Sequence, residues 1–191
     1  MTTGRLEAFS DAVIAIVITI MVLELRVPHR ANLGALREVA PVFLVYVLSF
    51  VYLAIYWNNH HHLMVLTDRI NGKILWANVH LLFWLTLVPF TTGWMGESDF
   101  APVPTAVYGV DLLLAAIAYF ILQSAIVAEQ GLGSKLANAL GRDLKGKASP
   151  LLYISAIPLA FISRWIALGL YVFVALMWLI PDRRIESAVG G

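Results

Sequence analysis

Long apolar runs separated by short polar segments dominate the chain. Four of these runs cover residues 6–25, 39–57, 74–94 and 105–128. A helix needs roughly 20 mostly apolar residues to cross a bilayer, and each run comes near that length. The pattern therefore predicts four transmembrane helices in this part of the chain.

The last apolar block, residues 148–180, is too long for one span and is interrupted by Ser163-Arg164-Trp165. A single helix would overshoot a hydrocarbon core of roughly 30 Å and would place Arg164 at its most costly depth. Two short helices, 148–163 and 165–181, with a tight turn at Arg164 fit better. We expect an all-α integral membrane protein with six spans in a single domain, residues 1–191, and five spans as the alternative.

Composition agrees with a chain whose solvent is lipid. Hydrophobic residues make up 60% and charged residues 13%, and the mean hydropathy is +0.81, whereas soluble domains carry about 25% charged residues. The net charge of +1 argues against a nucleic-acid partner. Because there is no cysteine, disulfides, thiolate metal sites and thiol nucleophiles are excluded.

The distribution of basic residues predicts the orientation. With six spans, one side of the membrane receives nine of them: Arg5, Arg69, Lys73, Lys135, Arg142, Lys145, Lys147, Arg183 and Arg184. The other side receives four: Arg26, Arg30, Arg37 and Arg164. Cytoplasmic loops carry the excess of Lys and Arg. We therefore expect a multi-pass protein of the cell membrane with both termini in the cytoplasm.

The first apolar segment differs from the others because ionisable residues flank and enter it. Arg5, Glu7 and Asp11 gather at its start and Glu24 marks its end. Such groups at a membrane span are costly and are functional candidates by default. At about 100° per residue, an apolar stripe runs along the same helix, formed by Ala12, Ile16, Ile20 and Leu23, with Thr19 on its flank.

Asp11 lies about 140° around the helix axis from Ile16, so it is expected to point into neighbouring helices and to need a buried partner. The candidate partners are Arg5, His60, His61, Asn78 and His80. From spacing alone, Ser10 and Asp11 could equally be capping or anchoring residues. An apolar stripe at helical spacing is also more typical of packing than of a pore.

Arg5-Leu6-Glu7-Ala8-Phe9-Ser10-Asp11 resembles the Arg-x-x-x-Phe-Ser-Asp signature of the transmembrane protein 175 family, the endosomal and lysosomal potassium channels with many prokaryotic members. The similarity covers nearly the whole chain. It includes Trp57-Asn58-Asn59-His60-His61, the stretch from Asn78 to Pro89-Phe90-Thr91, and Trp178-Leu179-Ile180-Pro181-Asp182.

This resemblance implies a homotetrameric, potassium-permeable cation channel in which the first helix of each six-helix subunit lines a central pore. It places a hydrophobic constriction at Ile16, with further narrow layers at Thr19 or Ile20 and at Leu23. It also implies a structural polar motif that holds the pore helix against its neighbours, comprising Arg5, Phe9, Ser10, Asp11, His60, His61 and Asn78. The implied ligands are K⁺ and other monovalent cations, without a cofactor.

The expected mechanism is a pore that four Ile16 side chains close by dewetting. Thr19 hydroxyls would then give a modest preference for K⁺ over Na⁺. Glu24 is expected near the outer mouth, where it would enrich cations or pair with Arg26. No Thr-Val-Gly-Tyr-Gly filter is present, and Thr91-Thr92-Gly93-Trp94 has the wrong chemistry for a carbonyl ring.

Other classes of function fit less well. The set Ser10, Asp11 and His60 is the nearest approach to a catalytic constellation, and no glycine-rich oxyanion motif accompanies it, so an enzyme is not expected. Consecutive histidines, His60-His61-His62, point in different directions on a helix and do not predict a metal site. A secondary ion transporter, including a proton-linked one, remains the alternative, although no internal repeat of the kind typical of transporters is visible.

Overall fold

The computed structural model describes residues 2–25, 27–28, 31–140 and 144–179, and this part of the chain consists of helices joined by turns and short loops. The helices in order are α1 (Thr3–Leu23), α2 (Leu33–Val65), α3 (Gly72–Glu97), α4 (Pro102–Gln130), α5 (Lys135–Leu140), α6 (Leu144–Ile162) and α7 (Arg164–Leu179). Four of them, α1 to α4, are long and apolar enough to cross a membrane by length and composition. The protein is therefore an all-helical membrane protein.

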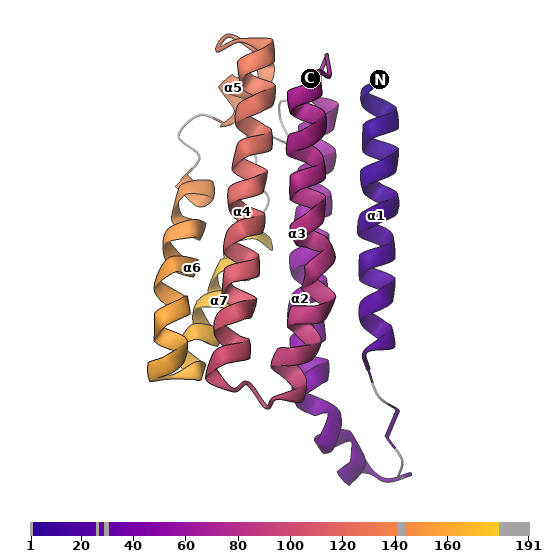
Figure 1. The fold of residues 1–191 in the computed structure, drawn as a ribbon, viewed down its shortest axis with the longest axis vertical. Coiled ribbons are helices and arrows are strands. Elements are labelled where there is room, and N and C mark those ends of the chain that lie inside the picture. The colour runs from indigo at the N-terminus through magenta and orange to yellow at the C-terminus, as the bar shows by residue number, and fades with distance from the viewer. Residues whose placement is uncertain (1, 26, 29–30, 141–143, 180–191) are drawn as a thin grey trace.

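The helices run up and down side by side, with α1 at one side of the bundle and α6 and α7 at the other (Figure 1). Helix α3 lies in the middle and packs against α1, α2 and α4, and α4 in turn packs against α6 and α7. The start of α1, the ends of α2 and α4, and the start of α3 consequently share one end of the bundle, which we call the N-terminal end.

Two apolar clusters hold the bundle together. The first lies among α1, α2, α3 and α4 and contains Ile14, Leu53, Leu81, Leu85 and Leu122, among others. The second lies among α2, α4, α6 and α7 and is rich in tyrosine and alanine, including Tyr52, Tyr108, Ala156, Tyr171 and Val174. Alanine lets helix backbones approach closely, which is how helices gain packing energy in lipid.

Helix α2 is longer than the apolar run predicts. The sequence suggested residues 39–57, but the helix begins at Leu33 because Asn32 caps it, its side chain accepting a hydrogen bond from the backbone N–H of Ala35 at 3.0 Å. Pro41 lies inside the helix rather than at its start. The first part of α2 bends away from the bundle (Figure 1), as expected where proline removes a backbone hydrogen bond.

The last apolar block forms two helices, α6 and α7, separated at Ser163. Arg164 begins α7 and reaches the turn between α3 and α4, where its Nη1 donates to the carbonyl oxygen of Asp99 at 2.8 Å. That turn needs left-handed backbone at Asp99 and Phe100, with φ of 49° and 57°. Arg164 therefore lies at the end of the bundle, and its charge does not fall in the middle of a span.

Candidate functional site

A chain of hydrogen bonds crosses three helices near the N-terminal end of the bundle. His60 on α2 lies with Nε2 2.7 Å from Asn78 Oδ1 on α3, Asn78 Nδ2 donates to Ser10 Oγ on α1 at 2.9 Å, and Ser10 Oγ donates to the carbonyl oxygen of Leu6 at 2.9 Å. His60, Asn78 and Ser10 are all fully buried. Because a carbonyl oxygen only accepts, His60 carries its proton on Nε2 and every bond runs in one direction.

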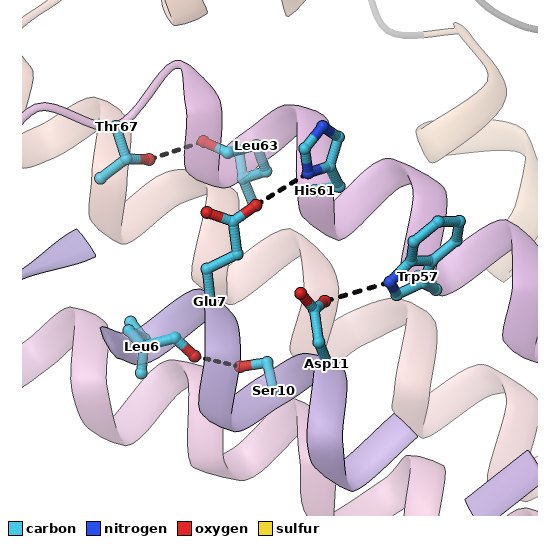
Figure 2. Close-up of polar contacts among 8 residues, drawn as sticks. All are labelled: Leu6, Glu7, Ser10, Asp11, Trp57, His61, Leu63 and Thr67. Carbon is cyan, nitrogen blue, oxygen red and sulfur yellow. Dashed lines mark hydrogen bonds and ion pairs between the residues drawn. The ribbon is translucent and has the colours of Figure 1, made fainter. Parts of the chain in front are cut away.

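Two further contacts flank this chain and join α1 to α2 (Figure 2). Trp57 Nε1 donates to Asp11 Oδ1 at 3.1 Å, and His61 Nδ1 lies 2.7 Å from Glu7 Oε1. Both acidic side chains are half-buried and point from α1 toward α2 (Figure 2). The start of α1 is thus held by side chains of α2 and α3 along one face.

The expectation that Asp11 finds a buried partner among Arg5, His60, His61, Asn78 and His80 is wrong. Its partner is Trp57, which was not among those candidates. Ser10, the residue before Asp11 on α1, points further inward. It is Ser10, and not Asp11, that lies beside Asn78. The structure places Arg5 at the surface.

His80 does not join the network either. It lies on the exposed side of α3, where Trp84 Nε1 donates to His80 Nε2 at 2.9 Å. The neighbouring His60 and His61 engage different helices, α3 and α1, so their rings diverge.

The opposite face of α1 is uncovered. Phe9, Ile16, Ile20 and Leu23 are 53%, 56%, 43% and 79% exposed, and Ala12, Ala15 and Thr19 on the same face are exposed as well. The hydroxyl of Thr19 donates to the carbonyl oxygen of Ile16 at 2.9 Å. Its oxygen lone pairs are therefore free to face outward from the helix.

A groove runs between this face of α1 and α3. Ile16, Ile20 and Glu24 line it from α1, and Pro89 and Phe90 are among the residues that line it from α3. The carboxylate of Glu24 lies over Gly93 of α3, where a larger residue would contact it. Arg26, the alternative partner suggested for Glu24, lies outside the described residues.

A second polar cluster lies deeper in the bundle and was missed from the sequence. Asp111 on α4 is 4% exposed, and its Oδ2 accepts from Thr91 Oγ1 on α3 at 2.9 Å. One turn away, Ser49 Oγ lies 3.0 Å from Tyr108 Oη and accepts from Thr92 Oγ1 at 2.6 Å. Asp111 interrupts an otherwise apolar run, which is the signal that should have marked it as a candidate.

The amino-acid sequence of the chain is similar to that of one known protein family. Residues 5–89 match the family described as endosomal/lysosomal potassium channel TMEM175. A potassium channel of Chryseobacterium sp. (strain P1-3) is 52% identical over 189 residues, covering 99% of this chain and 98% of the relative. A potassium channel of Chamaesiphon minutus is 32% identical, covering 91% of this chain and 92% of the relative.

The fold is also similar to a solved structure. The crystal structure of a lysosomal potassium-selective channel TMEM175 homolog from Chamaesiphon minutus aligns with a TM-score of 0.84 at 31% identity. The alignment covers 94% of this chain and 97% of that chain. The likeness therefore extends over all the helices and is not confined to the first motif.

Proposed function

The chain belongs to the TMEM175 family of potassium channels, and from that premise we propose that four copies form a K⁺-permeable pore lined by α1. It is not an enzyme. In this arrangement the uncovered face of α1 turns toward the symmetry axis, and both termini lie in the cytoplasm. K⁺ passes down its gradient across the cell membrane, without a cofactor.

The observation that carries this proposal is the division of α1 into two faces. One face is fastened to α3 by the buried hydrogen bond between Asn78 and Ser10, and to α2 by contacts through Glu7 and Asp11. The other face is left uncovered at the edge of the bundle (Figure 1). Small residues, Ala12 and Ala15, accompany the larger ones on the uncovered face. Small residues allow neighbouring helices to approach closely in a membrane.

In the proposed tetramer, four Ile16 side chains form the narrowest ring. A hydrated cation cannot pass such an apolar ring without losing water that nothing replaces, so the ring closes the pore by dewetting. Ile20 and Leu23 form further narrow layers toward the other end, and Thr19 offers hydroxyl oxygens between them. Because K⁺ releases water more readily than Na⁺, these oxygens give K⁺ a modest preference.

The test is K⁺ flux from lipid vesicles that contain the purified protein. Ile16→Asn makes the ring polar and should raise the flux about tenfold or more, since wetting removes the barrier. Ile154→Asn is the matched control, because Ile154 is similarly exposed but lies on α6, across the bundle from α1. Equal flux in the wild type and Ile16→Asn would overturn the assignment of the constriction.

Selectivity is tested separately at Thr19. Thr19→Val keeps the shape of the side chain and removes the hydroxyl, so the ratio of K⁺ to Na⁺ flux should fall toward one. An unchanged ratio would remove Thr19 from ion selection. Flux that saturates with K⁺ and requires a second ion gradient would instead indicate a secondary transporter.

A further inference from the structure

A cavity lies on the side of the bundle remote from α1, among α2, α4, α6 and α7. Its volume is about 50 Å³, and it is open to the outside at its mouth. Aromatic residues make up half of its lining, and they include Tyr52, Tyr56, Tyr119, Phe120 and Tyr153. Phe120 is 54% exposed, so the cavity opens toward the outer surface of the bundle, where lipid surrounds it.

One polar group in this cavity is left unsatisfied. Gln123 on α4 is 7% exposed and lines the cavity, and its amide has no hydrogen-bond partner among the residues that the structure describes. By contrast, Asn59 Nδ2 donates to the carbonyl oxygen of Ile55, and Trp178 Nε1 donates to Ser149 Oγ. The Gln123 amide opens onto the cavity, so an occupant that offers hydrogen-bonding atoms could pair with it.

The cavity lies toward the N-terminal end of the bundle, where we place the boundary between hydrocarbon and water. Helix α6 has 19 residues, which at 1.5 Å per residue span about 28 Å, close to the thickness of the hydrocarbon core. Gly146 and Ser149, in the first turns of α6, and Trp178, at the end of α7, all line the cavity. Tryptophan and glutamine at this depth match the glycerol and headgroup region of a lipid leaflet.

Two lysines flank a residue of the cavity wall in the sequence. Lys147 is exposed and directly follows Gly146 of the cavity wall, and Lys145 directly precedes it. Among the residues that the structure describes, none of those lining the cavity is acidic. Basic pockets between membrane helices at this depth recognise anionic lipid headgroups.

We propose that this cavity binds an anionic phospholipid from the surrounding leaflet. The phosphate lies at Lys147, the ester and glycerol oxygens meet the Gln123 amide, and the first part of one acyl chain packs among the tyrosine rings. The cavity holds a segment of one acyl chain and not a whole phospholipid, so the rest of the phospholipid stays in the bilayer. This site is separate from the proposed pore, because it opens on the opposite side of the bundle.

The experiment is native mass spectrometry of the full chain released from bicelles that contain equal amounts of phosphatidylglycerol and phosphatidylcholine with identical acyl chains. The wild type should retain phosphatidylglycerol in excess. Ala116→Phe fills the cavity and Gln123→Leu removes its amide, so both should lower the retained lipid severalfold. Ala128→Phe, an exposed position on α4 outside the cavity, is the control for added bulk and should retain lipid like the wild type.

Charge recognition is tested at a surface position that cannot disturb the fold. Lys147→Gln should lower the ratio of retained phosphatidylglycerol to phosphatidylcholine about fivefold, which is the effect of one lysine near an anionic surface. Lys135→Gln, an exposed lysine on α5, should leave the ratio unchanged. Retention that Ala116→Phe does not reduce, or a ratio that Lys147→Gln does not change, would overturn the proposal.

Discussion

Ser10 is the smallest residue in the buried chain of hydrogen bonds, and its hydroxyl joins α1 to α3. Its hydroxyl accepts from Asn78 on α3 and donates to its own helix at Leu6. Ser10→Ala would leave the Asn78 amide without an acceptor in a dry environment. We expect a loss of about 1–3 kcal/mol of unfolding free energy, the usual penalty for an unsatisfied buried donor.

The control for Ser10→Ala is Ser155→Ala on α6. Ser155 Oγ donates to the carbonyl oxygen of Leu151 four residues earlier, as Ser10 does to Leu6, but Ser155 is exposed and accepts from no other helix. Thermal or denaturant unfolding in detergent should therefore show a large effect at Ser10 and nearly none at Ser155. Equal effects would mean that the contact between α1 and α3 adds no stability.

Two substitutions of Asp11 test the hydrogen bond that it accepts from Trp57. Asp11→Asn keeps an Oδ1 that accepts from Trp57 Nε1, whereas Asp11→Ala removes it. Because this contact fastens α1 to α2 away from the uncovered face, we expect Asp11→Ala to weaken assembly or change opening. The ratio of K⁺ to Na⁺ flux should be unaffected.

Flux and native mass, measured together on the two Asp11 variants, check this prediction. Asp11→Asn should behave like the wild type in both measurements. A change of ion preference alone in Asp11→Ala would show that Asp11 faces the permeating ion.

Single-residue roles were the hardest to predict from the sequence. Helical spacing correctly indicated that Asp11 and Ile16 lie on different faces of α1, because 100° per residue fixes that geometry. It could not name the partner of Asp11, which depends on how α2 is rotated against α1. Trp57 was not among the candidate partners, which were all ionisable or amide side chains.

At the scale of helices, the fit between α4 and α7 depends on Gly109. A Cβ atom at this position would collide with the hydroxyl of Tyr171, which donates to the carbonyl oxygen of Thr105 at 3.0 Å. Tyr171 is fully buried and cannot retreat without losing that bond. We expect Gly109→Ala to cost about 1–3 kcal/mol through overpacking.

Gly169 on α7 is the matched control. It is exposed, and a Cβ atom there would meet nothing within 4 Å. Gly169→Ala should therefore raise stability by up to about 1 kcal/mol, the intrinsic preference of a helix for alanine. Thermal unfolding of the two variants should shift in opposite directions, and a stabilised Gly109→Ala would contradict the tight contact.

The extent of the helices was predictable only where polarity marks their ends. The break at Ser163 follows from Arg164, since a charged residue inside a long apolar block signals a turn. The first two turns of α2 were missed because Arg37 and Glu38 look like a loop in a search for apolar runs, while Asn32 and not hydropathy determines where this helix starts.

At the scale of the whole molecule, the proposed tetramer requires that the α1 side of the bundle packs against the other subunits. Both outer sides of the bundle expose large apolar side chains. Ile16 on α1 is 56% exposed and Phe161 on α6 is 60% exposed. Sequence pattern alone cannot distinguish a surface that faces lipid from one that faces another subunit, because both are apolar. The position of the symmetry axis must therefore be measured.

The absence of cysteine from the chain makes that measurement direct. A single Ile16→Cys variant places one thiol per subunit close to the proposed axis, within reach of the Cβ separation of about 3.5–4.5 Å that a disulfide needs. Oxidation in the membrane should join subunits in pairs, because each thiol bonds one other, and should give a band near twice the mass of one 21.1 kDa chain. Phe161→Cys, on the outer side, should stay monomeric under the same oxidation. Cross-linking at Phe161 together with none at Ile16 would place α6 at the centre of the assembly and exclude α1 as the pore helix.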